Sequence, residues 1–337
     1  MWNTFLNVGA MADSMRRGGD MAAILEPFMP DISLRPMQKH HWPEVADLIH
    51  VSTNYWYQRS GKPPIFSCRS VETQLFCRVY EDLDPGCCIL AVSDTTGRIA
   101  GSCFYHPRPT HVSLGIMNVH PNYFGQHVAG QLLKFITDFA DRENKPVRLV
   151  SSAMNLDSFS LYTRAGFVPR MAYQDMYIPV PAEGLPFRAA GQSRVRTATP
   201  ADAEAMAALE MERAYISRAK DFRYFLENRE GIWHASVIES AAGKIEGFLV
   251  SIAHAASNML GPGFAANAED AAALILAELD HHRGRAPVFL VPAHEAELVR
   301  QLYAWGAKNC ELHFAQVRGT YTPPNGIAMP TFMPETA

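Results

Sequence analysis

The chain has 337 residues, of which 48% are hydrophobic and 19% are charged, a composition that suits two folded domains of ordinary size. A formal net charge of −4 without a basic run argues against nucleic acid as the main partner. No apolar run approaches the about 18 residues of a membrane helix, and six cysteines without a C-x-x-C pattern fit a reducing cytoplasm.

The first half of the chain predicts one domain over 31–178. Residues 1–30 show no sustained periodicity and are predicted to form a loosely ordered extension. The elements expected after them are a strand, two helices, three strands, a helix, a strand, a helix and a final hairpin pair of strands, at 32–36, 42–52, 71–81, 87–93, 98–105, 112–119, 128–140, 147–151, 155–165 and 168–177. Composition and periodicity alone favour an α+β fold with a mixed sheet.

The second half repeats this order in a shorter form over 194–318, after a linker rich in proline and glycine at 179–193. Val195-Arg-Thr echoes Leu34-Arg-Pro, and strands and helices are expected at 200–211, 232–239, 244–252, 265–279, 288–291 and 295–305. The tail over 319–337 is broken by prolines and is expected to lie extended across a surface without forming an element.

One stretch of the first half, residues 119–133, predicts an anion site. It reads VHPNYFGQHVAGQLL, the end of a strand, a turn and the start of a helix. Gly125 and the small residues Ala129 and Gly130 let backbone amides approach a ligand closely. The first amides of a helix lack partners within it, and the helix dipole adds positive potential. We interpret this stretch as a pyrophosphate cradle, with an ordinary strand–turn–helix connection as the alternative.

A second stretch follows the strand at 147–151 and predicts a short helix that ends at Gly166. Asn155, Ser158 and Tyr162 have the spacing i, i+3, i+7 and therefore share one stripe of this helix. Asn155, at its start, also suits the role of helix N-cap.

Together the two stretches resemble the motifs of the GNAT acyltransferase superfamily. The acyl-CoA loop of that family, Val-x-Pro-x-x-Arg-Gly-x-Gly-x-Gly/Ala, is matched at Val119, Pro121, Gly125 and Ala129, whereas Phe124 replaces the usual Arg or Gln and His127 replaces the middle glycine. The second stretch resembles the pattern Asn-x-x-Ser/Ala-x-x-Leu-Tyr-x-x-x-Gly-Phe throughout. The resemblance implies two GNAT-like domains in three layers, each a mixed and mostly antiparallel sheet flanked by helices.

The second copy is expected to have lost its cofactor site. Its counterpart of the cradle is residues 261–270, where Pro262 removes an amide donor and Glu269 and Asp270 bring negative charge. The polar stripe is replaced by Glu295, Leu298 and Leu302. We interpret this half as structural, shaping the acceptor cleft or a homodimer contact.

The resemblance implies that acetyl-CoA is the cosubstrate and that no metal takes part. The residues expected to hold acetyl-CoA are Met117, Asn118, Val119, Phe124, Gly125, Gln126, His127, Val128, Ala129, Gly130, Asn155, Ser158 and Tyr162. The predicted reaction is direct transfer of an acetyl group to a primary amine in a ternary complex. The alternatives are a non-catalytic acyl-CoA sensor and a protein-lysine acetyltransferase.

For proton transfer the resemblance points to Tyr162, whose phenol would protonate the departing thiolate. Its alternative role is that of an aromatic residue that packs helix against sheet. The fourth strand lacks the glutamate that serves many relatives as general base. Asn118 and His120 at the end of that strand, or His106 and His111 near its start, are candidates. Attack by an already neutral amine is equally compatible with the sequence.

Acceptor recognition in the family comes from the segment between the first two helices, here Tyr55, Trp56, Tyr57 and Arg59. Aromatic side chains can enclose a small amine, including by cation–π contact. Arg59 and Lys62 hint at an acceptor that carries a carboxylate or phosphate.

Overall fold

The computed structural model describes residues 31–333, so the predicted extension at 1–30 and the last residues of the predicted tail, 334–337, lie outside the described residues. The α-helices in this range are α1 (Trp42–Arg59), α2 (Gln74–Leu83), α3 (Val128–Arg142), α4 (Leu156–Arg164), α5 (Ala203–Ala214), α6 (Ala219–Glu227), α7 (Ala268–Asp280) and α8 (Ala296–Ala304). No helix within 31–333 is long and apolar enough to cross a membrane.

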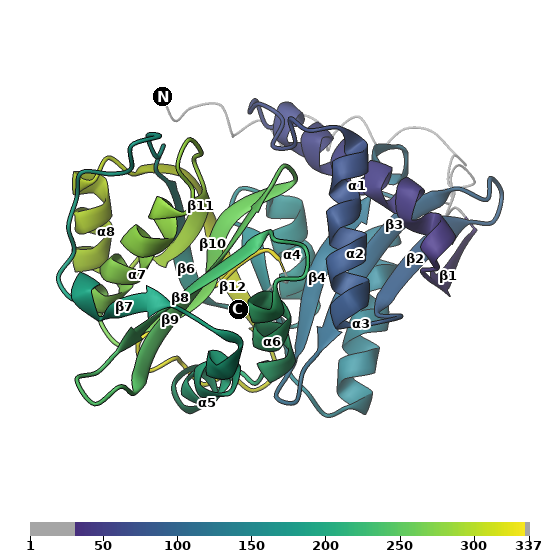
Figure 1. Cartoon of the computed structure of the whole chain (residues 1–337). Coiled ribbons are helices and arrows are strands. Elements are labelled where there is room, and N and C mark those ends of the chain that lie inside the picture. The colour runs from purple at the N-terminus through teal and green to yellow at the C-terminus, as the bar shows by residue number, and fades with distance from the viewer. Residues whose placement is uncertain (1–30, 334–337) are drawn as a thin grey trace, which may run out of the picture.

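The strands form a single sheet that runs through the whole molecule (Figure 1). They are β1 (Ile32–Pro36), β2 (Cys88–Ser93), β3 (Ile99–Pro107), β4 (Val112–Val119), β5 (Val147–Ser152), β6 (Val168–Tyr177), β7 (Val195–Thr197), β8 (Trp233–Glu239), β9 (Ile245–His254), β10 (Ser257–Ala265), β11 (Val288–Pro292), β12 (Lys308–Arg318) and β13 (Ile327–Met329). The order across the sheet is β1-β2-β3-β4-β5-β12-β6-β11-β10-β9-β8-β7, with β13 beside β10. Each strand of one half therefore lies as many places from the central β12–β6 pair as its counterpart in the other half.

The two halves exchange their last strands. β12 pairs antiparallel with β5 of the first half, and β6 pairs antiparallel with β11 of the second half. The two exchanged strands also pair with each other. The predicted hairpin at 168–177 is wrong, because these residues form one continuous strand. The place of the missing strand beside β5 is taken by β12, which comes from the other half.

Helices cover both faces of the sheet, which gives the predicted α+β architecture of three layers. On α2 the buried residues Leu75, Val79 and Leu83 recur every four positions, so the helix has one apolar face. α1, α2, α5 and α6 contribute to one hydrophobic cluster that continues across both halves. On the other face, α3 and α4 cover the first half and α7 and α8 the second.

In each half two neighbouring parallel strands pair over a short stretch and then diverge. β4 pairs with β5 only at Val112 and Ser113, and β10 pairs with β11 only at Met259. β4 and β10 also carry an irregularity against their antiparallel neighbours, β4 opposite Cys103 to Tyr105 of β3 and β10 between Leu260 and Gly263. The gap between separating strands is thus a feature of both halves.

The gap in the second half is filled by the tail of the chain. β13 pairs antiparallel with β10 at Gly263, Phe264 and Ala265, and its Ile327 and Met329 are buried. The expectation that the tail crosses a surface without forming an element is therefore wrong for these residues. Gly261 and Pro262, predicted to belong to a cradle, lie within β10.

Candidate functional site

The predicted cradle is a tight turn between β4 and α3. Pro121–Tyr123 form a 3-10 turn, after which Gly125 and His127 take the left-handed backbone conformation at φ 76° and 59°. His127 thus adopts the conformation that a glycine at its position would favour. The amides of Phe124 and Gln126 donate within the turn to the carbonyls of Pro121 and Tyr123, so these two predicted donors are engaged. The remaining donors are those at Gly125 and at the start of α3.

The starts of α3 and α7, which occupy corresponding places in the two halves, differ in charge. α3 begins at Val128 without a side-chain cap and without an acidic residue in its first turn. α7 is capped by Asn267, whose side-chain oxygen accepts from the Asp270 amide at 2.9 Å, and Asp270 also pairs with Arg194. An uncapped helix start keeps its positive potential for an external anion, and a capped acidic one does not.

The gap beside β4 lies next to this turn. Met117, Asn118 and Val119 pair with β3 on one edge, and within residues 31–333 no strand pairs with their other edge. The Asn118 side chain donates to Ser52 Oγ at 2.8 Å and to Thr53 Oγ1 at 3.3 Å on α1. Its Oδ1 is buried and has no hydrogen-bond partner among residues 31–333. An extended ligand can therefore add to this edge in the way that a strand would.

The predicted stripe on α4 has a structural role at both ends. Asn155 caps the helix, because its Oδ1 accepts from the Ser158 amide at 3.1 Å. Tyr162 is only 7% exposed and packs with its ring 5.7 Å from that of Phe167. Ser158 is half-buried. The alternative roles of Asn155 as a cap and Tyr162 as a packing residue are thus both realised, and neither excludes contact with a ligand.

The histidines predicted as bases are engaged elsewhere. His120 Nδ1 accepts from the Asn122 amide at 3.2 Å, so that nitrogen is not open to a substrate proton in this arrangement. His106 is buried with its Nδ1 2.7 Å from Asp84. His111 is buried beside Ser113, and burial, aided by nearby Arg148, lowers its pKa well below the ordinary value.

The predicted acceptor residues at the end of α1 reach two different places. Tyr55 is exposed and its ring lies edge-on to Phe124 of the turn, with centroids 5.8 Å apart. Trp56 packs edge-on against Tyr57 at 4.9 Å, and Arg59 is exposed. The Tyr57 hydroxyl donates to Glu311 Oε2 at 2.8 Å. The end of α1 therefore connects the turn before α3 with β12.

Glu311 is the residue of this region that the sequence analysis missed. It is 6% exposed on β12, in the exchanged strand, and it also accepts from the Ser152 hydroxyl at the end of β5. Burial, followed by the Glu311 charge and hydrogen bond, raises the pKa of the Tyr57 phenol well above its ordinary value, which keeps it a donor. No local motif marks Glu311, since only the strand exchange brings it beside Ser152.

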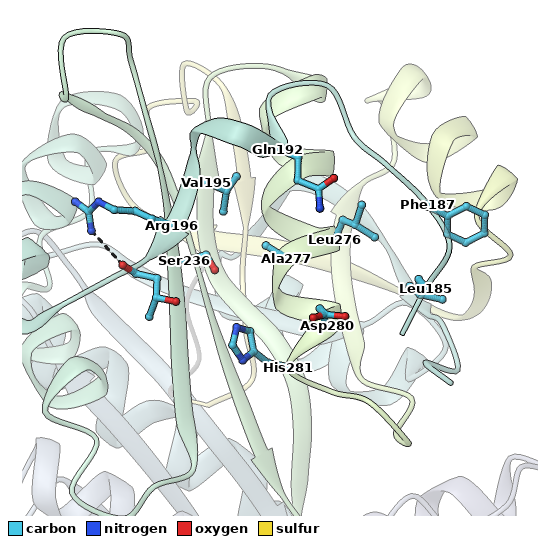
Figure 2. A pocket seen from close by; sticks show the side chains of 11 residues that line it. Leu185, Phe187, Gln192, Val195, Arg196, Ser236, Leu276, Ala277, Asp280 and His281 are labelled. Atoms are coloured by element: carbon cyan, nitrogen blue, oxygen red, sulfur yellow. Dashed lines mark hydrogen bonds between the residues drawn. The ribbon is translucent and has the colours of Figure 1, made fainter. Parts of the chain in front are cut away.

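A separate cavity of about 300 Å³ lies in the second half, and Figure 2 shows the side chains around it. Its lining residues come from the linker, β7, β8 and the end of α7, and include Phe187, Gln192, Ser236 and His281. Arg196 at its edge is already paired with Asp202 and Glu239. Within the described residues, no group of three or more His, Cys, Asp or Glu side chains is arranged to hold a metal ion.

Family models match both halves of the chain. The model for the acetyltransferase (GNAT) family matches residues 46–167, and one for an acetyltransferase (GNAT) domain matches residues 219–324. Among curated proteins, none matches this sequence.

Solved structures of acetyltransferases share the fold over most of the chain. A putative acetyltransferase from Pyrococcus horikoshii has a TM-score of 0.69 at 13% identity, over 92% of this chain and 97% of that one. A GCN5-related N-acetyltransferase from Sphaerobacter thermophilus scores 0.58 at 18% identity, over 88% and 98%. A tandem GNAT protein from the clavulanic acid biosynthesis pathway scores 0.56 at 14% identity, over 87% and 100%. With family models on both halves and this tandem architecture, the chain belongs to the GNAT acetyltransferase superfamily.

Proposed function

We propose that the first half is an acetyl-CoA-dependent N-acetyltransferase that transfers an acetyl group directly to a primary amine of a small molecule in a ternary complex. Membership of the family already implies acyl transfer with acetyl-CoA as donor. Beyond this, we assign the site to the first half and the acceptor to the class of small-molecule primary amines.

One contrast between the halves carries this proposal. In the first half the edge of β4 at Met117–Val119 is open, and the adjoining helix start has no cap and no acidic residue. In the second half β13 fills the gap, and Asn267 and Asp270 occupy the helix start. A pantetheine arm and a pyrophosphate have room and donors only in the first of these arrangements.

Each residue then has a role in the proposed reaction. The amides at Gly125 and at the start of α3 hold the pyrophosphate, and β4 aligns the pantetheine arm along its open edge. The neutral amine attacks the thioester carbonyl carbon, so that a C–N bond forms and the C–S bond breaks. Tyr162, a buried residue of α4, is assigned the protonation of the leaving sulfur.

The test combines thermal stability with a thiol-release assay. Acetyl-CoA at about 100-fold excess over its dissociation constant should stabilise the wild-type chain by about 2.7 kcal/mol, which raises the melting temperature. Tyr162→Phe should show the same stabilisation with a rate of thiol release at least about 100-fold lower in the presence of a substrate amine.

The outcomes separate the proposal from its alternatives. If acetyl-CoA leaves the melting temperature unchanged, the first half does not hold the cofactor and the proposal fails. If acetyl-CoA binds but no amine or protein lysine releases thiol, the chain is an acyl-CoA sensor, a reading favoured by Phe124 and His127 in the cradle. Turnover with lysine-containing peptides alone would identify a protein acetyltransferase.

A further inference from the structure

Glu311 is a buried carboxylate at the edge of the proposed site. It receives hydrogen bonds from Tyr57 on α1, at 2.8 Å, and from Ser152 at the end of β5. The neighbouring carboxylate on β6, Asp175, lies 2.8 Å from His313 Nδ1. Glu311 itself forms an ion pair with Lys62, whose Nζ lies 3.8 Å from Oε2.

α1 places this carboxylate across the gap from β4. Thr53 and Tyr57 are four residues apart and therefore point to the same side of α1. Thr53 contacts Asn118 of β4, whereas Tyr57 contacts Glu311 beside the end of β5. Asn118 and Glu311 thus stand on opposite sides of the gap between β4 and β5, the gap that the proposed function assigns to the pantetheine arm.

The surroundings of the Lys62 ammonium form a site for a cation. Nζ donates to the Cys310 carbonyl at 3.1 Å, lies near the Glu311 carboxylate, and sits 5.9 Å from the centre of the Tyr57 ring. A carboxylate, a carbonyl and an aromatic face are the groups that recognise an alkylammonium ion. The Lys62 side chain is 25% exposed, so its ammonium can move out into solvent without any rearrangement of the core.

We propose that the Glu311 carboxylate, the Cys310 carbonyl and the Tyr57 ring form the acceptor's ammonium subsite, in which Lys62 stands until a primary alkylammonium displaces it. This inference rests on the proposed function and narrows its acceptor to amines that are cationic at neutral pH. Two protons leave the acceptor nitrogen during transfer. Glu311 takes the first and passes it to solvent, and the second ends on the departing sulfur.

The exchanged strands supply this carboxylate to one half only. His313 pairs with Ser152 on β5, and at the corresponding position of the second half Tyr173 pairs with Pro292 on β11. Two residues earlier on the exchanged strands stand Glu311 and Met171 respectively. The position that corresponds to Glu311 in the second half thus carries an apolar side chain, which agrees with a single acceptor subsite per chain.

The test uses a panel of primary alkylamines from methylamine to hexylamine with cadaverine and tyramine, assayed on the full chain with acetyl-CoA. Glu311→Gln removes the charge while keeping an oxygen for Tyr57 and Ser152, and should raise KM for the best alkylamine at least tenfold. Lys62→Met removes the resident cation and should lower that KM severalfold. Glu297→Gln, an exposed residue on α8, serves as the control for loss of a carboxylate and should leave KM unchanged.

If Glu311 served in packing alone, Glu311→Gln and Lys62→Met would change KM in the same direction, and this result would overturn the inference. An unchanged KM in Glu311→Gln or a raised KM in Lys62→Met would overturn it as well. The same holds if no amine of the panel is acetylated and none stabilises the complex with CoA. Each of these results leaves the proposed function standing if acetyl-CoA still stabilises the chain and another small-molecule amine releases thiol. Loss of that stabilisation in the wild type would refute the proposed function itself.

Discussion

Gly125 holds the turn before α3 in a backbone conformation that other residues rarely adopt. Its φ is 76°, and a Cβ added to it would meet no atom within 4 Å. A side chain at this position therefore costs backbone strain but no steric clash. Gly97, in the turn between β2 and β3, has the same properties with φ 70° and lies outside the cradle.

This pair of glycines allows a matched test of the cradle. Gly125→Ala and Gly97→Ala should each lower the free energy of unfolding by about 1 kcal/mol, because alanine is strained at positive φ. Only Gly125→Ala should weaken acetyl-CoA binding, since only that turn belongs to the proposed pyrophosphate cradle. Calorimetric titration of both variants checks this. Equal affinities in the two would remove Gly125 from the binding site.

At the residue scale, the sequence predicted local features and missed distant ones. The turn at Gly125 and the cap at Asn155 depend on neighbours within a few positions, so a motif can reveal them. Tyr57 was predicted to face an acceptor, but its hydrogen bond joins residues that lie far apart in the sequence. Nothing near Glu311 in the chain indicates that it reaches α1.

β13 shows how an element can replace a ligand. It pairs with β10 along the edge that corresponds to the open edge of β4, and it packs buried side chains into the gap. The backbone groups that a pantetheine arm would satisfy in the first half are here satisfied by the chain itself.

We therefore expect one acetyl-CoA site per chain. Ile327→Ala should lower the free energy of unfolding by about 2–4 kcal/mol, because Ile327 is 2% exposed and truncation leaves a cavity. Met211→Ala, at a 43% exposed position on α5, should cost far less and serves as the control. Both variants should keep the acetyl-CoA affinity of the wild type in calorimetric titration. A stoichiometry of two would contradict the assignment of β13.

The order of elements was largely predictable, and the exceptions have physical reasons. Periodicity and turn residues predicted the order of the first half up to β6. β10 was missed because Gly261-Pro-Gly263 has the composition of a turn, whereas tertiary pairing with β9 and β13 makes it a strand. α6 was missed as well, since it follows α5 after a short break. The exchange of β6 and β12 could not be read from the sequence, because it pairs strands that lie far apart in the chain and leaves no local pattern.

A buried ionic network joins the halves on the face shared by α2 and α6. Arg108 donates to Asp84 at 2.9 Å and to Asp221 of α6 at 3.0 Å, and Lys220 also reaches Asp84. Burial alone would raise the pKa of Asp84, but the His106 hydrogen bond and the charges of His106 and Arg108 hold it well below its ordinary value. Asp84 is thus charged in the folded chain at neutral pH.

This depressed pKa predicts how stability depends on pH. The network stabilises the fold above the ordinary aspartate pKa of about 3.9, and this contribution is lost as the pH falls through the lower folded pKa. Asp84→Asn should cost about 3 kcal/mol at pH 7, because Arg108 loses a buried partner, and the difference from wild type should shrink below about pH 4. Urea unfolding at several pH values measures it.

The control for this prediction is the exposed pair of Asp138 with Lys134 on α3. Asp138→Asn should change the free energy of unfolding by less than about 0.5 kcal/mol at any of these pH values. A penalty for Asp84→Asn that stays constant down to pH 3 would show that the network does not titrate as described.

The strand exchange also sets the order in which the protein can be completed during synthesis. β5 and β6 leave the ribosome early, yet their partners β12 and β11 belong to the last part of the chain. At roughly 5–20 residues per second, their edges wait on the order of ten seconds for those partners. Unpaired strand edges are where chains aggregate. The nascent first half is therefore exposed to aggregation during this time, and premature termination before β12 yields a fragment in which β5 lacks its antiparallel partner.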